Sequence, residues 1–217
     1  MIDFAAAREA MVDRQVRPAD VTLYPIIEAM LAVPREDFVP ASWRPVAYLG
    51  EHVPIAAGRV LLDPRVFAKL LDALNPGPSD LVLDLGCGYG YSTAVLARMA
   101  EAVVALEEDP GLAAEAEALL AAHAVDNAVV QTGPLALGDP DHGPFDAILV
   151  EGAIETLPET VAGQLKPGGR IAAIFAADAA GQARLGLRTE QGITWRRLFD
   201  ATAPLLPGFQ AAKAFEF

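Results

Sequence analysis

The residues best suited to chemistry in this chain lie in one short segment, Asp84 to Tyr91, which reads Asp-Leu-Gly-Cys-Gly-Tyr-Gly-Tyr. Glycines at alternate positions predict a tight turn whose backbone a ligand can approach closely. The apolar run Leu81–Leu85 predicts a buried strand that brings Asp84 to its carboxyl edge. The helix that follows would point its free N–H groups and positive dipole end at the ligand. The segment therefore predicts a ligand site at the edge of a parallel sheet.

The glycine spacing and two acids indicate which ligand this is. A dinucleotide site would have a third small residue where Tyr91 stands, and a P-loop would need Gly-Lys-Ser/Thr, which is absent. Asp84 would oppose a pyrophosphate but suits a cationic amino group such as that of methionine. Glu107 follows the predicted strand Val103–Leu106, 23 positions after Asp84, where its carboxylate can accept hydrogen bonds from both hydroxyls of a ribose. The alternatives are an NAD-type site and a purely structural glycine turn.

This combination, D-x-G-x-G-x-G and then an acid ending the next strand, is similar to class I methyltransferases, which implies S-adenosyl-L-methionine as the cofactor. Within the site we expect Cys87 to fill space rather than act as a nucleophile, and Glu108 to face solvent. Thr132 and Gly133 follow the third strand, where adenine would lie. The predicted cofactor-binding residues are Asp84, Gly86, Cys87, Gly88, Gly90, Tyr91, Glu107, Glu108, Thr132 and Gly133.

The elements that must position this site fall on both sides of Asn75-Pro76-Gly77-Pro78-Ser79, which no regular element can cross. The sequence predicts an N-terminal helical segment, residues 1–79, that contributes to the acceptor pocket. It also predicts a core, residues 80–217, that binds the cofactor and forms one compact unit with that segment. Before the break we expect helices at Phe4–Val16, Val21–Leu31 and Pro64–Leu74, with an irregular proline-rich stretch from Val33 to Ile55.

After the break, short apolar runs alternate with helical segments, which is typical of a mostly parallel sheet with helices on both faces. The predicted fold class is therefore α/β and Rossmann-like, closed by a C-terminal antiparallel hairpin and preceded by the helical extension. Its helices are expected at Tyr91–Met99, Leu112–His123 and Pro158–Leu165. Its strands are expected at Leu81–Leu85, Val103–Leu106, Ala128–Val130, Phe145–Val150, Arg170–Phe175, Arg184–Arg188 and Trp195–Phe199, with a turn at Lys166–Gly169.

Length, composition and charge indicate which classes of substrate, location and metal site are not expected for this chain. A chain of 217 residues with 53% apolar content can bury a substantial core in a single domain. The net charge of −13 repels phosphate backbones, so nucleic acid is not expected as a substrate. No apolar run is long enough to span a membrane and the N-terminus lacks a signal-peptide pattern, so we expect a cytoplasmic protein. The single cysteine predicts neither a disulfide nor a thiolate metal site, and the oligomeric state is not indicated.

Several further segments resemble one methyltransferase family. MVDRQVRP (11–18), IIEAMLAVPREDFVP (26–40) and AYLGEHVPIAAGRVLLDP (47–64) are similar to the protein-L-isoaspartate O-methyltransferase family. GPFDAILVEGA and QLKPGGR extend the resemblance, which covers about residues 8–175. It implies methyl transfer to the carboxylate of L-isoaspartyl residues in proteins, with a protein or peptide as the partner.

The departures from the family pattern cluster around the acceptor pocket. Val60 and Leu62 stand where the family has Thr and Ser, whose hydroxyls would hydrogen-bond the substrate, and Gly50 replaces an Asp. Apolar residues at these positions cannot hydrogen-bond a bound carboxylate, and each lost hydrogen bond costs about 1–3 kcal/mol of binding free energy. Arg59 flanks the pocket and could supply charge-assisted bonds instead. The predicted substrate-binding residues are Arg59, Val60 and Leu62.

The chemistry predicts no specific catalytic residue. The sulfonium is already activated, so alignment of the methyl group with the acceptor oxygen does most of the work. A carboxylate with a reference pKa near 4 is ionised at neutral pH and needs no general base. Two alternatives remain open: a methyltransferase for a different small-molecule or peptide acceptor, and a protein that binds S-adenosylmethionine without turnover.

Overall fold

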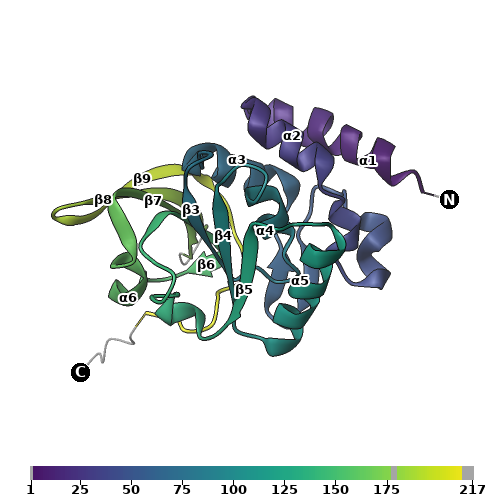
Figure 1. Cartoon of the computed structure of the whole chain (residues 1–217). Coiled ribbons are helices and arrows are strands. Elements are labelled where there is room, and N and C mark those ends of the chain that lie inside the picture. The colour runs from purple at the N-terminus through teal and green to yellow at the C-terminus, as the bar shows by residue number, and fades with distance from the viewer. Residues whose placement is uncertain (1, 177–179, 212–217) are drawn as a thin grey trace, which may run out of the picture.

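A seven-stranded sheet forms the centre of the molecule, in the order β5-β4-β3-β6-β7-β8-β9 (Figure 1). The computed structural model describes residues 2–176 and 180–211. Strands β3 to β7 are parallel and β8 and β9 are antiparallel additions at one edge, which confirms the predicted fold class. The strands are β3 (Leu81–Leu85), β4 (Ala102–Glu107), β5 (Ala128–Thr132), β6 (Phe145–Ile154), β7 (Leu165–Phe175), β8 (Gln182–Thr189) and β9 (Gly192–Asp200).

The register of β3 against β6 sorts the buried side chains onto two faces. Asp84 pairs with Leu149 and Leu85 pairs with Val150. Since side chains alternate along a strand, Asp84 and Leu149 share one face while Leu85 and Val150 share the other. The Leu149 face packs against the helical N-terminal segment and α4, whereas the Val150 face packs against the C-terminal segment around Leu206.

The N-terminal helices differ from prediction mainly in length. The expected helix Phe4–Val16 is split into α1 (Phe4–Met11), capped by Asp3, and a wider π-helical turn, Val12–Val16. The second helix, α2 (Tyr24–Ala32), begins later than expected because Pro25 occupies its first turn, where a missing N–H costs nothing. The helix α3 (Pro64–Leu74) has the predicted bounds, with Asp63 accepting from the Val66 N–H at its start.

A short hairpin that begins at the end of the proline-rich stretch was not predicted. Strands β1 (Val53–Ala56) and β2 (Arg59–Leu61) pair in antiparallel fashion around a turn in which Gly58 has φ 68°. Two strands this short, one of them containing Pro54, carry too little alternation to indicate a sheet. The hairpin matters because it places Ile55 and Arg59 next to the glycine turn.

The remaining helices and the second half of the sheet also depart locally from the prediction. Helix α4 (Tyr91–Leu96) is shorter than expected, α5 (Pro110–Ala122) starts two residues earlier and is capped by Asp109, and α6 (Glu159–Ala162) is a single turn. The predicted turn at Lys166–Gly169 is a bulge inside β7, between the pairs Phe145↔Leu165 and Ala147↔Arg170. Its Gly168 has φ 79°, a conformation that glycine adopts without strain.

One hydrophobic cluster links the two predicted segments. It contains Met11, Leu62 and Leu71 from the N-terminal segment together with Val82 and Tyr91 from the core. Over residues 2–176 and 180–211, no helix is both long enough and apolar enough to cross a bilayer.

Candidate functional site

The glycine turn between β3 and α4 has the predicted geometry. Gly86, Gly88 and Gly90 all have positive φ, at 85°, 58° and 86°. The Gly90 N–H donates to the Cys87 carbonyl at 2.9 Å, which closes the turn, and the Gly86 N–H donates to Leu106 O of β4 at 2.8 Å. The turn therefore lies at the carboxyl edge of β3, where open α/β sheets bind ligands.

Asp84 lies fully buried beneath this turn. Its Oδ2 accepts hydrogen bonds from the Ser92 and Thr93 hydroxyls at 2.7 and 2.6 Å, while Oδ1 is buried without a partner among the described residues. Burial, only partly offset by these two hydrogen bonds, raises the pKa of Asp84 to about 6. The unpaired oxygen is one hydrogen-bond position open to a cationic group.

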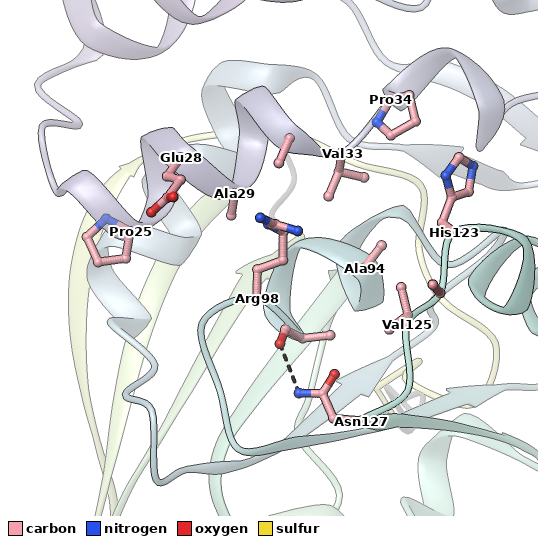
Figure 2. Close-up of a pocket in the computed structure, with 13 residues that line it drawn as sticks. Pro25, Glu28, Ala29, Val33, Pro34, Ala94, Arg98, His123, Val125 and Asn127 are labelled. Atoms are coloured by element: carbon pink, nitrogen blue, oxygen red, sulfur yellow. Dashed lines mark hydrogen bonds between the residues drawn. The ribbon is translucent and has the colours of Figure 1, made fainter.

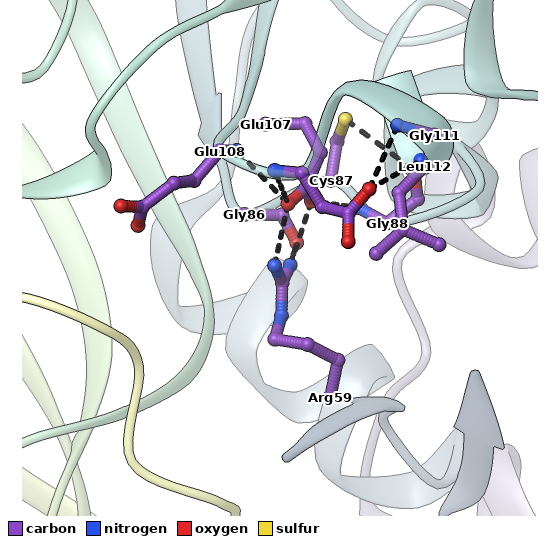
Figure 3. A network of polar contacts seen from close by, with 9 residues as sticks. Arg59, Gly86, Cys87, Gly88, Glu107, Glu108, Gly111 and Leu112 are labelled. Carbon is purple, nitrogen blue, oxygen red and sulfur yellow. Dashed lines mark hydrogen bonds and ion pairs between the residues drawn. The ribbon is translucent and has the colours of Figure 1, made fainter. Parts of the chain in front are cut away.

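Glu107 ends β4 as predicted and is fully buried. Its carboxylate accepts from the backbone N–H groups of Gly88 at 2.8 Å, Glu108 at 2.9 Å and Asp109 at 3.1 Å (Figure 3). These bonds fix the carboxylate against the glycine turn. It therefore lies where a ligand on the turn would meet it.

Arg59 occupies the other side of Glu107. The two guanidinium Nη atoms form a bidentate ion pair with the carboxylate, at 2.5 and 2.7 Å, and Nη2 also donates to Gly86 O at 2.8 Å (Figure 3). The sequence assigned Arg59 to the acceptor pocket, but the structure places its guanidinium at the predicted ribose-binding carboxylate. Ile55, from the same hairpin, covers the turn so closely that a Cβ on Gly88 would overlap its side chain.

The polar groups at this edge of the sheet suit S-adenosylmethionine chemically. Glu107 is a diol acceptor at the end of β4, the glycine turn offers bare backbone, and the unpartnered Asp84 Oδ1 suits an ammonium group. In the conformation described, Arg59 satisfies Glu107 and Ile55 shields Gly88. A ligand that uses Glu107 would therefore have to displace the Arg59 guanidinium, and a ligand that lies on Gly88 would have to displace the Ile55 side chain.

The other predicted cofactor-binding residues around the glycine turn differ in burial and in their contacts. Cys87 is buried and its thiol pKa is raised well above the ordinary value by burial, which suits a space-filling residue. Glu108 is exposed and points away from the network (Figure 3). The Tyr91 ring lies in the core, with the Arg35 guanidinium 5.0 Å from its centroid. Thr132 is exposed at the end of β5, and the Gly133 N–H donates to Glu107 O at 3.0 Å, so the adenine assignment stays a prediction.

The positions that distinguish this chain from the family pattern lie beside the hairpin. Leu62 is fully buried in the core and Val60 is half-buried on β2. In this conformation Leu62 therefore lines no open surface, and its role in acceptor binding stays a prediction. Gly50 is exposed, and a Cβ there would lie 3.4 Å from the Gln15 amide oxygen.

Two buried charged residues near the site were missed by the sequence analysis. Arg35 is fully buried, donating from Nε to Ala47 O at 2.7 Å and from Nη2 to Leu62 O at 2.6 Å. Glu151, in β6, is 4% exposed, and within residues 2–176 and 180–211 its Oε1 has no hydrogen-bond partner. Arg35 lies in the segment VPRE and Glu151 in the segment GPFDAILVEGA, which carry the family resemblance but give no sign that these charges are buried.

A separate cavity of about 400 Å³ lies between α2 and the α4–β5 region, away from the glycine turn (Figure 2). Its walls include Ala29, Val33 and Ala94, with Arg98 and His123 at the polar side. None of the predicted site residues lines it. The described part of the chain also contains no group of three or more His, Cys, Asp or Glu placed to hold a metal ion.

Comparisons with known proteins agree with this architecture. The family described as protein-L-isoaspartate(D-aspartate) O-methyltransferase matches residues 6–185. Proteins named protein-L-isoaspartate O-methyltransferase are similar over most of their length. The one from Methylorubrum extorquens is 41% identical over 78% of this chain and 74% of its own, and the one from Roseiflexus sp. is 38% identical over 95% of both.

Solved structures share the fold. One named protein-L-isoaspartate O-methyltransferase superposes with a TM-score of 0.80 at 22% identity, over 93% of this chain and 66% of that one. A candidate protein-L-isoaspartate O-methyltransferase from Plasmodium falciparum, in complex with S-adenosyl-L-homocysteine, gives 0.77 at 21% identity over 95% and 99%. With a family match over most of its length, this chain belongs to the protein-L-isoaspartate O-methyltransferase family, whose class I fold it shares.

Proposed function

We propose that this chain is an S-adenosylmethionine-dependent O-methyltransferase that methylates a carboxylate of a protein substrate, the side chain of L-isoaspartyl residues. The observation that carries the proposal is the glycine turn with Glu107 fixed against it, in a chain of this family. S-adenosylmethionine supplies a methyl group on a sulfonium that is already activated for transfer. Glu107 would bind the ribose of S-adenosylmethionine, and Asp84 would bind its amino group. The backbone of the glycine turn would lie against the same ligand.

The protein then has to align and desolvate the reactants. Holding the acceptor oxygen in line with the methyl group removes most of the entropic barrier. Because an aspartyl-type carboxylate is already ionised near pH 7, no base is required. The N-terminal segment, residues 1–79, supports the acceptor side of this proposal, since its β1–β2 hairpin brings Arg59 to Glu107 at the edge of the sheet.

Val60 and Leu62 favour a second candidate, a methyltransferase for a different acceptor, because they remove the hydroxyls expected to bind isoaspartyl carboxylate. A non-catalytic S-adenosylmethionine-binding protein is the third candidate. The discriminating experiment measures methyl transfer to an isoaspartyl peptide beside its normal aspartyl counterpart, with S-adenosylhomocysteine binding measured in parallel by calorimetry.

We expect cofactor-product binding at one site per chain and methylation of the isoaspartyl peptide only. Binding without methylation of any carboxylate would contradict the enzyme assignment. Methylation of both peptides, or of a small carboxylate alone, would contradict the isoaspartyl assignment.

A further inference from the structure

Glu151 is a buried acid at the same sheet edge that the proposed function leaves without a role. It follows Val150, the partner of Leu85, so it lies on β6 beside the start of the glycine turn. Val150 and Gly152, on either side of it, both face the C-terminal segment around Leu206, so the Glu151 side chain lies on the opposite face, which carries Asp84 and Leu149. The carboxyl group therefore points toward the site, not toward the C-terminal segment.

The surroundings of Glu151 leave it without an ion-pair partner among the described residues. Arg59 is committed to Glu107, and Arg35 uses two of its nitrogens on backbone carbonyls. The groups close enough to act on its charge are Asp84 of β3, Cys87 of the turn, Tyr91 of α4, Arg35 of the N-terminal segment and Arg59 of β2.

Burial disfavours the charged form of such a carboxyl, and a neighbouring carboxylate disfavours it further. Both act on Glu151: burial, reinforced by the Asp84 charge, raises its pKa well above the ordinary value, against the opposing effect of Arg35 and Arg59. A neutral carboxyl group carries an O–H that can donate a hydrogen bond. Its Oε1 has no partner to receive that bond within the described residues.

The acceptor side of the site lacks donors where the family pattern has two. Val60 and Leu62 stand in place of hydroxyl residues. Arg35 donates to the backbone oxygen of Leu62 at 2.6 Å and lies close enough to Glu151 for their charges to interact. A carboxylate bound there needs a donor to replace the lost hydroxyls.

We propose that Glu151 is a specificity-determining residue that donates the proton of its neutral carboxyl group in a hydrogen bond to the acceptor carboxylate. The inference rests on the proposed function, since it assumes a carboxylate acceptor. An acid–carboxylate hydrogen bond is charge-assisted and thus stronger than one from a hydroxyl to a neutral group. The opposite role, a general base for a neutral acceptor, would require Glu151 to be ionised.

Two substitutions separate these roles. Glu151→Gln keeps a donor that cannot ionise, whereas Glu151→Leu removes all hydrogen bonding at similar volume. We expect Glu151→Leu to lower kcat/KM for an isoaspartyl peptide by about tenfold to a hundredfold, mainly through KM, the scale for one lost hydrogen bond to a charged group. Glu151→Gln should recover most of that loss. Wild-type kcat/KM should fall at alkaline pH as Glu151 ionises, and Glu151→Gln should lack this decline.

A direct readout tests the protonation state without turnover. The infrared difference spectrum of wild type minus Glu151→Gln, both with S-adenosylhomocysteine, should show a neutral carboxyl band at pH 7. Glu115→Gln, an exposed carboxylate on α5, is the matched control and should change neither the spectrum in that region nor the peptide KM.

Each outcome decides a different claim. An ionised Glu151, or an inactive Glu151→Gln, would overturn the donor role even if wild type methylates the peptide. Equal KM values for wild type and Glu151→Leu would overturn its role in specificity. A wild type that binds S-adenosylhomocysteine and shows the neutral band, yet never methylates an isoaspartyl peptide, would overturn the proposed acceptor and with it the partner assigned to Glu151.

Discussion

At the scale of single residues, Asp84 shows how a binding site costs stability. Its carboxylate is fully buried with one oxygen unsatisfied, and burial raises its pKa to about 6 from an unperturbed 3.8. A carboxyl whose folded-state pKa is raised contributes stability below its unfolded pKa, and that contribution is lost as pH rises through the folded pKa. Asp84 therefore weakens the unliganded fold at neutral pH.

Asp84→Asn should reveal this cost. The free energy of unfolding of the variant minus that of wild type should grow as pH rises from about 4 to about 6, then level off, by roughly 1–3 kcal/mol. Urea unfolding at several pH values measures it. A difference that shrinks over that range would show that Asp84 is stabilised in its charged form. The same variant should bind S-adenosylhomocysteine more weakly if Asp84 receives the amino group.

Gly88 is a second residue whose identity the site requires. It has φ 58° and lies under Ile55, so a side chain meets both backbone strain and overlap. Gly88→Ala should lower the midpoint of thermal unfolding and weaken S-adenosylhomocysteine binding at least tenfold. Gly58→Ala is the matched control, because Gly58 has φ 68° with no atom within 4 Å of a Cβ. It should cost only the strain of about 1 kcal/mol. Equal effects on binding would contradict the assignment of the turn.

Leu62 gives the third residue-scale prediction. It is fully buried in the hydrophobic cluster, so Leu62→Ser removes packing and buries a hydroxyl. The free energy of unfolding should fall by about 3–5 kcal/mol. Val60→Thr, on the half-buried face of β2, should cost about 1 kcal/mol. Denaturant unfolding checks both. Restoring the hydroxyls of the family pattern is therefore not a neutral change in this chain, and a Leu62→Ser variant as stable as wild type would contradict the core position.

At the scale of elements, the β1–β2 hairpin controls access to the site. Arg59 holds Glu107 in a bidentate pair, and Ile55 covers Gly88. A ligand that needs Glu107 binds only the fraction of molecules in which the pair is broken, so its apparent affinity is reduced by that fraction. We therefore expect the hairpin to couple the N-terminal segment to cofactor binding.

Arg59→Gln should remove the coupling between the β1–β2 hairpin and cofactor binding. We expect S-adenosylhomocysteine to bind about tenfold more tightly by calorimetry, since it no longer competes with Arg59. The unliganded variant should lose roughly 2 kcal/mol or more of stability, because Glu107 is left buried without its cation. Arg44→Gln removes an exposed arginine and should change neither quantity. Weaker binding by Arg59→Gln would instead show that Arg59 helps to hold the cofactor.

At the scale of the whole molecule, the charge of −13 is the main long-range property. This negative charge repels polyanions over distances longer than those of direct atomic contacts. We expect no retardation of DNA or RNA in a gel at moderate salt, up to protein concentrations of about 10⁻⁴ M, the weak end of non-specific binding. Salt-sensitive retardation at lower concentration would show that local basic residues outweigh the net charge.

The sequence by itself determined the parallel sheet, the glycine turn and the place of Glu107. These follow from local rules: apolar runs of strand length, glycines at alternate positions and an acid at the end of the next strand. The family resemblance followed from segments such as VPREDFVP and QLKPGGR. Each signal is contained within a few neighbouring residues, so it can be interpreted without knowing what packs against it.

Only the tertiary structure decided where Arg59, Leu62 and Glu151 lie and what surrounds them. Arg59 meets Glu107 across 48 positions of sequence, and the pairing of β6 with β3 brings Glu151 close enough to Asp84 for their charges to interact. The hairpin that carries Arg59 is too short to show a period, and a single acid in an apolar strand gives no sign of its neighbours. Burial and charge pairing are properties of residues brought together by packing, and that is why the acceptor side of the site could not be derived from the order of residues along the chain.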